Sequence, residues 1–586
     1  MRAPARPLMR SATIVAHDPS LRREGRILTA QVRIPDERFA PGPWSSRFHV
    51  VDYDSTTHTM YRPREENREL FDDPNPSESV ILGDPGFHAS NAFVIATRTL
   101  ELFQRALGRR LSWSFPGHQV KIVPHAFRES NAFYSDDLEA LLFGYFPGRD
   151  GMVYTCLSHD IIVHETTHAI LDGLRTRYAD PSSSDQGAFH EGFADLVALM
   201  SVFSLPEVVG ALLDEKPGAG KRIRATRLTE QALRTGPLLA IAEQFGEETS
   251  GVRGRPLRRS LELTPSTSYY LREAEFRSVH RRGEILVAAV LSAFVKVWAA
   301  RVKRLGTEKA RDYDADAVVE EGARAAQHLL TMAIRAIDYT PPCHLTFGDY
   351  LSALLTADRE MYPDGGKHEY PALLRKSFAE YGVKPTSRQK DGAWRVGLVD
   401  ESVELSYHGV HHDSLRYDRD EVFRFAWENR EALGLREDAY TRVLSVRPCI
   451  RIDRDGFTLR ETVAEVHQQI DLTAGELGGW GVKSPRGMER TARVTLYGGC
   501  VLVFDEFGKL KYNIHNSIAN ADAQACRLAS LWEAGAFKRD RRTGELRLRG
   551  GTADFAALHR ARSRGAAVAT TTGAGPGAEE GWPDGR

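Results

Sequence analysis

The spacing of apolar residues divides the chain into three regions. Up to about residue 157, short β-type runs such as RFHVVDYD surround one stretch with helical spacing, AFVIATRTLELFQRALG. From residue 158 to about 383 the pattern becomes mostly helical, as in SHDIIVHETTHAILDGL and GEILVAAVLSAFVKVWAARVKRL. Strand-like runs then return in RVTLYGGCVLVF and KLKYNI around a turn at residues 505–508, and a last helix is predicted in NADAQACRLASLWEAG.

These regions predict an α+β protein with a β-rich N-terminal lobe at residues 1–157 and a mainly helical lobe at residues 158–383. The polar stretch KPTSRQKDG, residues 384–392, is typical of a linker, and residues 393–563 would form an appended α/β module. Residues 564–586 are rich in Ala, Thr, Gly and Pro and too poor in core-forming side chains to offset the entropy of ordering. We therefore expect a disordered tail.

The overall composition argues against a polyanionic partner. Lys plus Arg total 78 and Asp plus Glu total 79, so no global field would attract nucleic acid or an anionic membrane. The N-terminus lacks the apolar core of a signal peptide, and no run approaches the ~20 apolar residues of a membrane span. Five widely spaced cysteines without a CxxC pair do not suggest disulfides. We expect a cytoplasmic protein that binds neither membrane nor nucleic acid.

The HETTH motif is the clearest chemical signal in the helical region. His164 and His168 are four residues apart, so they lie on one helix face and their imidazoles can share one ion. Glu165 projects about 100° round the helix from His164, where it can accept a proton from metal-bound water without being a ligand. An HExxH string can arise by chance, but the apolar flanks place this one in a buried helix, where ionisable groups without a metal would be costly.

A second helical stretch supplies the third ligand that a catalytic zinc usually needs. In HEGFADLVALM, Glu191 lies in the first turn, and Asp195 is one turn further on and faces the same way. Asp195 would accept the second ring N–H of a ligand histidine and so fix its tautomer. The alternative, a solvated acidic helix face, is disfavoured by the apolar neighbours. The sequence therefore predicts a Zn²⁺ site formed by His164, His168 and Glu191.

The order of these motifs resembles the thermolysin family of gluzincin zinc metallopeptidases. In that family an HExxH helix is followed by an E-x-x-x-D helix, as in Glu191 to Asp195. The resemblance covers roughly residues 52–383. It implies a two-lobed fold in which the zinc cleft lies between a β-rich N-terminal lobe and a helical C-terminal lobe, with residues 393–563 outside the resemblance.

The resemblance also implies roles for further residues. Asn131 and Ala132, in an Asn-Ala-Phe segment like the family's edge strand, would hydrogen-bond the substrate backbone. His280, in a Val-His pair that opens a long apolar helix, would donate a hydrogen bond to the oxyanion and be oriented by Glu275. Tyr178 would be the second oxyanion donor. Arg259, in LRRS, would bind a substrate carbonyl.

The chain departs from the family pattern at several positions. His190 stands where the family has an asparagine before the glutamate ligand, and Glu275 stands where it has an aspartate. The acidic cluster that binds calcium in the family is absent, since SVFSLPEVVGALL offers only Glu207. We therefore do not expect calcium to stabilise this protein.

The function predicted from these features is that of a zinc-dependent endopeptidase acting on a peptide or protein substrate, with Glu165 as the general base for a zinc-activated water. One alternative is a zinc exopeptidase or an enzyme that matures one dedicated peptide, which a terminus-binding charged pair would distinguish. Another is a binding or scaffold protein whose zinc is structural or whose catalysis has lapsed, although a structural site has no need of Glu165. The sequence indicates no partner for the C-terminal module.

Overall fold

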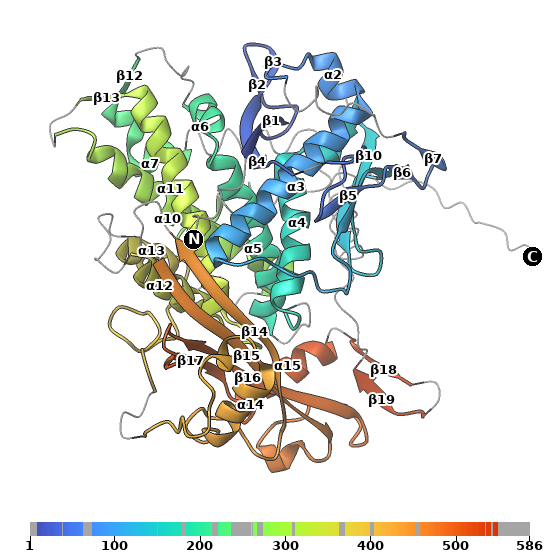
Figure 1. Ribbon diagram of the computed structural model, residues 1–586, viewed down its shortest axis with the longest axis vertical. Coiled ribbons are helices and arrows are strands. Elements are labelled where there is room, and N and C mark those ends of the chain that lie inside the picture. The colour runs from blue at the N-terminus through green and yellow to red at the C-terminus, as the bar shows by residue number, and fades with distance from the viewer. Residues whose placement is uncertain are drawn as a thin grey trace, which may run out of the picture.

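A computed structural model describes residues 9–548 except 38, 63–72, 149–150, 179–182, 214–220, 236–259, 261, 267–273, 308–310, 363–369, 399–402, 453–457, 534 and 541–542. The structure mixes helices with several sheets, as predicted. Helices fill its centre, the N-terminal strands lie beside them, and the C-terminal strands form a separate layer at the foot of the view in Figure 1. The predicted tail at 564–586 lies outside the described residues.

Two main sheets and two short strand pairs form the described β-structure of the N-terminal region. Strands β1 (Met9–Val15) and β4 (Thr29–Pro35) pair antiparallel without a break in register. In the second sheet the order is β11-β10-β8-β5, and β9 pairs with β10 as well. The strands of this second sheet are β5 (Phe48–Val50), β8 (Val120–Phe127), β9 (Ala132–Ser135), β10 (Ala140–Pro147) and β11 (Met152–Tyr154). The remaining short pairs are β2 (Arg22–Arg23) with β3 (Arg26–Ile27) and β6 (Tyr53–Asp54) with β7 (Thr59–Met60).

Helix α3 (Pro85–Leu107) joins both sheets to the helical region. It follows the short helix α2 (Glu78–Gly83), and the Asp84 side chain caps it by accepting from the Gly86 N–H. Pro85 suits the first turn, where its missing N–H is not needed. Most of α3 is buried against β1, β4, β8 and the helix that carries the HETTH motif.

The helical region is built around a tight crossing of two helices, α5 (Ser184–Phe203) and α10 (Val279–Lys303). A Cβ atom placed on Gly192 would lie only 2.8 Å from the carbonyl oxygen of Gly283, so the two backbones meet where neither residue has a side chain. This contact lies one residue after Glu191 and three residues after His280. The other elements are α4 (His159–Leu174), α6 (Pro206–Leu212), α7 (Glu230–Thr235), α11 (Ala315–Ala336), α12 (Phe347–Met361), α13 (Tyr370–Ala379) and the small pair β12 (Arg222–Arg224) with β13 (Asp312–Asp314).

Helix α10 is long and apolar enough to cross a membrane by length and composition alone. However, 89% of its most apolar window is buried inside the protein, against α5, α11 and α13. Helices α5 and α6 pass the same test only when joined across an 83° bend. Packing within the core is thus sufficient to explain why α10 is so apolar.

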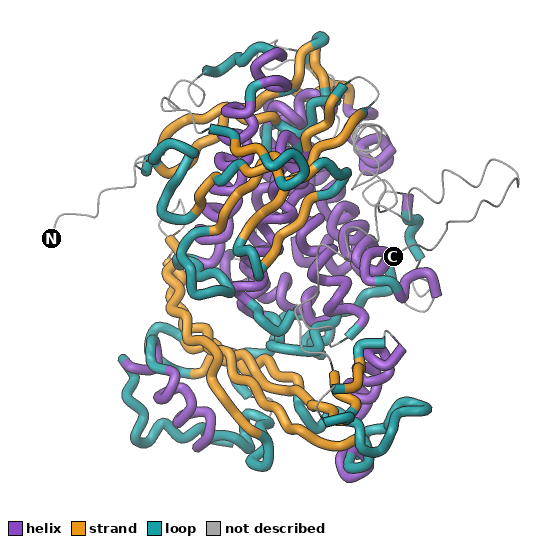
Figure 2. Tube along the Cα trace, turned by 90° about the vertical axis from the view of Figure 1, so that its right-hand side faces the viewer, coloured by secondary structure: helices purple, strands orange, loops and turns teal. Residues whose placement is uncertain are grey.

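The C-terminal module is a strongly curved, mainly antiparallel sheet with one helix at each side (Figure 2). The predicted hairpin is present, since β16 (Arg493–Phe504) and β17 (Leu510–Asn516) meet at a turn where Gly508 has φ 77°. Two longer strands, β14 (Tyr440–Ile452) and β15 (Thr458–Thr473), extend the sheet without having been predicted. The other elements are α14 (Arg419–Glu428), α15 (Ala521–Glu533), β18 (Phe537–Arg539) and β19 (Leu546–Leu548).

This sheet is packed directly onto the helical region. Side chains of β15, β16 and β17, among them Val463, Val503 and Tyr512, belong to the same hydrophobic core as helices α4, α11 and α12. The segment predicted as a linker also folds back, because the Thr386 N–H donates to the Gly348 carbonyl and the Ser387 N–H donates to Ser352 Oγ. The module therefore rests on the helices through a continuous apolar contact.

Candidate active site

Helix α4 carries both predicted histidine ligands in its buried centre. His164 and His168 are both 0% exposed, and their ring centroids are 4.4 Å apart, as the four-residue spacing requires. Between the two histidines, Thr166 and Thr167 donate their hydroxyl hydrogens to carbonyls one turn back, so both hydroxyls are satisfied in the core. The polar HETTH sequence can thus lie inside an apolar environment.

Glu191 reaches the two histidines from α5. Its Oε1 lies 3.6 Å from His168 Nε2 and its Oε2 lies 3.8 Å from His164 Nε2. All three donor atoms lie within 4.8 Å of one another, and all three residues are buried. These separations are too long for hydrogen bonds but suit three ligands around one ion. Two imidazole nitrogens and one carboxylate oxygen form a donor set that fits zinc, with one position left for water.

Each histidine is oriented by a second residue behind it. His164 Nδ1 lies 2.7 Å from Asp195 Oδ1, the contact that the helical spacing predicts. His168 Nδ1 lies 2.8 Å from Nδ1 of His190, which therefore occupies the orienting position. For His168 to donate there, His190 must keep its proton on Nε2. Sequence reasoning noted His190 only as a departure from the family pattern, and its place beside Glu191 was the available signal.

Glu165 lies between α4 and the edge strand β9. Its Oε2 accepts the backbone N–H of Tyr134 at 3.0 Å, which fixes the position of the carboxylate. The Tyr134 hydroxyl lies 3.3 Å from Asp172, which is also on α4. The pKa of Tyr134 lies well above its ordinary value, mainly because the side chain is buried and also because of the negative charge of Asp172. Strand β9 is therefore fixed to α4 at two points.

Asn131 and Ala132 lie at the start of this edge strand. Asn131 is 0% exposed, and its Oδ1 accepts the Ala132 N–H at 3.0 Å, which directs the side-chain amide Nδ2 away from that backbone. That Nδ2 has no hydrogen-bond acceptor among the described residues. Strand β9 is hydrogen-bonded to β10 along one edge, and α4 packs against it. A buried amide donor is thus available at the start of the strand whose Tyr134 N–H binds Glu165.

His280 is the third histidine near Glu191. It lies in the first turn of α10, where the crossing at Gly192 and Gly283 brings it close to α5. Its Nδ1 is 3.4 Å from Glu191 Oε2, and 21% of its side chain is exposed. The structure therefore places His280 beside the predicted zinc ligands and open to solvent.

Two other predicted residues have partners outside this cluster, and a third is not among the described residues. The Tyr178 hydroxyl lies 2.7 Å from both Thr340 Oγ1 and the Pro341 carbonyl oxygen, so its single proton is used inside the core, where burial raises its pKa. The prediction of Tyr178 as an oxyanion donor is therefore wrong in this structure. Glu275 is exposed and paired with Arg281, not with His280 as predicted. Arg259 lies outside the described residues.

A buried HExxH helix with a carboxylate from the next helix is the arrangement of a zinc metallopeptidase site. Residues 144–385 match the family model described as Fungalysin metallopeptidase (M36). That is a zinc metalloendopeptidase family related to the thermolysin-like gluzincins, so the match supports a zinc metalloprotease and confirms zinc as the cofactor. It starts within β10 and does not reach the C-terminal sheet. No curated protein matches the chain.

Proposed function

We propose that this protein is a zinc-dependent endopeptidase with its active site between β9 and helices α4, α5 and α10. The observation that carries the proposal is the buried group of His164, His168 and Glu191 with Glu165 next to it and held by an edge strand. A structural zinc site would not need a carboxylate placed beside the ligands. The family match over residues 144–385 supports the same reaction class.

In this proposal, His164, His168 and Glu191 hold the zinc. Zinc bound there would polarise the scissile carbonyl and lower the pKa of a water molecule. Glu165 accepts a proton from the attacking water and delivers it to the leaving amine nitrogen. Asp195 and His190 keep the Nε2 atoms of the two histidines directed at the ion by accepting their Nδ1 hydrogens.

His280 is the residue that we assign to the developing oxyanion. Its Nδ1 lies 3.4 Å from Oε2 of Glu191, one of the proposed zinc ligands, and 21% of its side chain is exposed. Oxyanion donors of this kind typically contribute a factor of ~10²–10³ in rate. We assign no other described residue to the role of second oxyanion donor that was predicted for Tyr178.

The substrate would bind as an additional strand along β9. A peptide adding to a sheet edge gains main-chain hydrogen bonds that do not depend on its side chains. Asn131 Nδ2 and the Ala132 backbone are the groups that we propose to contact it, which places the scissile bond near Glu165. Such a site can accept the interior of a chain, as an endopeptidase requires.

The test separates endopeptidase activity from the alternatives. Purified protein is given an unfolded protein substrate and a peptide blocked at both ends, with and without a zinc chelator, and the products are identified by mass spectrometry. Internal cleavage of both, lost with the chelator and restored by zinc, is expected. Cleavage only next to a free terminus would indicate an exopeptidase. Zinc binding without any cleavage would indicate a binding protein instead.

A further inference from the structure

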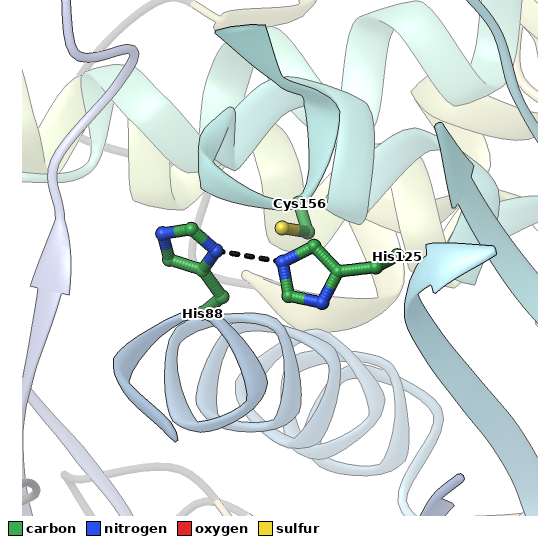
Figure 3. A group of neighbouring side chains, drawn as sticks. All are labelled: His88, His125 and Cys156. Atoms are coloured by element: carbon green, nitrogen blue, oxygen red, sulfur yellow. Dashed lines mark hydrogen bonds between the residues drawn. The ribbon is translucent and has the colours of Figure 1, made fainter. Parts of the chain in front are cut away.

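A second group of metal-ligating side chains lies in the N-terminal region. His88 of α3, His125 of β8 and Cys156 of the short helix η1 (Thr155–Leu157) come from three separate elements. They are 1%, 2% and 0% exposed, and their donor atoms lie within 4.8 Å of one another. Figure 3 shows the two imidazole rings meeting nitrogen to nitrogen, with the Cys156 sulfur beside the gap between them.

The surrounding hydrogen bonds determine which ring nitrogens carry hydrogen. His88 Nε2 lies 3.0 Å from the carbonyl oxygen of Ile81, which can only accept. His125 Nδ1 lies 2.8 Å from Asp52 Oδ2, while Asp52 Oδ1 accepts the His125 backbone N–H. Both contacts place the ring hydrogen on the outer nitrogen of each histidine. The inner nitrogens, His88 Nδ1 and His125 Nε2, then face each other with lone pairs.

Those two inner nitrogens are only 2.8 Å apart. Two lone pairs at this distance repel, and a metal ion between them would relieve the repulsion, as would a shared proton. Asp52 and the Ile81 carbonyl are the kind of outer partners that metal-bound histidines have, a carboxylate and a backbone carbonyl. Cys156, buried beside the gap, adds a thiol that a proton shared by two rings would not need.

The environment suits an ion that is held tightly. The Tyr154 ring lies 4.5 Å from the His88 ring, and the Tyr61 ring lies 4.7 Å from the His125 ring, centroid to centroid. These aromatic rings limit access of water to the cluster. A pocket of about 220 Å³ is lined in part by Asp52 and Tyr61, which both contact His125.

We propose that His88, His125 and Cys156 bind a second zinc ion, separate from the one in the active site. Two imidazoles and one thiolate are typical zinc ligands, and zinc binding would release the thiol proton. The nitrogens would have to move apart from 2.8 Å to about 3.3 Å for tetrahedral geometry with Zn–N distances of about 2.0–2.1 Å. The ion would tie α3 and β8 to the segment that leads directly into α4.

The thiolate makes the second site distinguishable from the active site, whose described ligands include no sulfur. Full-length protein purified without added metal should contain two zinc ions per chain. Glu191→Ala and Cys156→Ala should each retain one. After replacement of zinc by cobalt, thiolate-to-cobalt charge-transfer absorption should be present in the wild type and in Glu191→Ala but absent in Cys156→Ala. Cys343→Ala, which removes another buried thiol, is the matched control and should keep the absorption.

One zinc per chain in the wild type, with none left in Glu191→Ala, would overturn the proposal and leave a proton shared by the histidines. The proposed function would survive that result. If Cys156→Ala does not fold, X-ray absorption on Glu191→Ala decides instead. A sulfur neighbour at about 2.3 Å from zinc is expected, and a shell of nitrogen and oxygen alone would contradict the site.

Discussion

Helix α4 contributes to two groups of buried ionisable side chains whose charges are matched in different ways. Its centre belongs to the active-site cluster, and its C-terminal end belongs to an ionic cluster at the contact with the C-terminal sheet. We name the second group the interface cluster. The active-site cluster consists of His164, Glu165, His168, Glu191, Asp195 and His280. The interface cluster consists of Arg109, Arg175, Arg335, Asp338, Glu461 and Glu465.

In the interface cluster, acids and arginines lie at hydrogen-bond distance. Arg175 Nη1 is 2.9 Å from Glu465 Oε2, and Arg109 holds Asp338 through two contacts of 2.6 and 2.7 Å. In the active-site cluster the Glu191 oxygens remain 3.6 and 3.8 Å from the histidine nitrogens. The difference is between charges that neutralise one another directly and donor atoms arranged around a shared centre.

The pKa values in the interface cluster reflect this direct matching. Burial alone would raise the pKa of Glu465, but the charge of Arg175 and the hydrogen bond from His467 outweigh it and lower the pKa to about 2. Burial is likewise outweighed by Arg109 for Asp338, whose pKa lies well below its ordinary value. Such ion pairs stabilise the folded state. Their charged groups are already matched by one another, so they do not form a ligand-binding site. We therefore predict that substitutions in the active-site cluster affect activity and that substitutions in the interface cluster affect stability, each independently of the other.

The largest expected effect is on catalysis. Glu165→Gln should lower kcat by ~10³-fold or more, because the amide has the shape of the carboxylate but cannot accept the proton of water. The zinc content and Tm should stay close to those of the wild type, as measured by metal analysis and calorimetry. Glu320→Gln, on the exposed face of α11, is the control and should have no effect. Retained turnover in Glu165→Gln would mean that another group is the base.

The next largest effect is on stability. Arg175→Met should reduce the free energy of unfolding by ~3–5 kcal/mol, because Glu465 stays buried after losing its closest arginine. Calorimetry would show the loss, while kcat of the folded fraction should remain near the wild-type value. Arg324→Met, which breaks an exposed ion pair with Glu320, should cost less than ~1 kcal/mol. A loss of activity that exceeds the loss of folded protein would show that the clusters are coupled.

After Glu165→Gln, His280→Ala should be the most informative substitution in the active-site cluster. If His280 acts on the oxyanion alone, kcat should fall by ~10²–10³-fold with little change in KM. Steady-state kinetics on one blocked peptide would measure both constants. A change confined to KM would instead make His280 a substrate-binding residue.

What could be predicted from the sequence depends on whether a contact joins residues close in the sequence or residues far apart in it. His164 with His168, and Glu191 with Asp195, were predicted because helical periodicity sets the positions within each pair, whereas it does not show that the two helices meet. Tyr178 was misplaced because it lies in the connection after α4, where no periodicity determines direction and the core supplied other acceptors. The local spacing of residues near a helix start was also insufficient to show that Glu275 pairs with Arg281.

The C-terminal sheet shows the corresponding limit for strands. β16 was predicted from its apolar run, and β17 from its alternation of apolar and polar residues. β15 was missed because it is buried yet carries Glu461, Glu465 and His467, which resemble a solvated segment until their partners are known. Those partners lie more than a hundred residues away for Arg335 and Arg175. The cluster of His88, His125 and Cys156 was invisible for the same reason.

A moderate effect is expected from acid. The pKa of Glu465 falls from its ordinary value of 4.5 to about 2 on folding, so its contribution to stability is complete above pH 4.5 and is lost as the pH falls toward 2. Denaturant unfolding between these pH values should show stability decreasing by an amount on the order of 3 kcal/mol from this group. Glu465→Gln should be less stable overall but should have a smaller pH slope in this window. An unchanged slope would place the acid sensitivity elsewhere.

The smallest predicted effect tests whether His190 orients His168. His190→Ala should weaken zinc binding in the active site by about 10–100-fold, because the buried Nδ1 hydrogen of His168 loses its acceptor and the ring loses its fixed direction. His190→Asn should recover most of the affinity, since a side-chain amide oxygen can accept the same hydrogen. Competition with a calibrated chelator measures the zinc affinity of both variants. Both are made in a Cys156→Ala background, so that the proposed second site does not contribute.

Equal losses in His190→Ala and His190→Asn would mean that the size of the imidazole matters more than its acceptor. No loss in either variant would leave the contact with Asp195 as the orienting bond of the cluster. In the interface cluster, by contrast, an acceptor is a charged partner, so its removal affects folding and not the affinity for an ion.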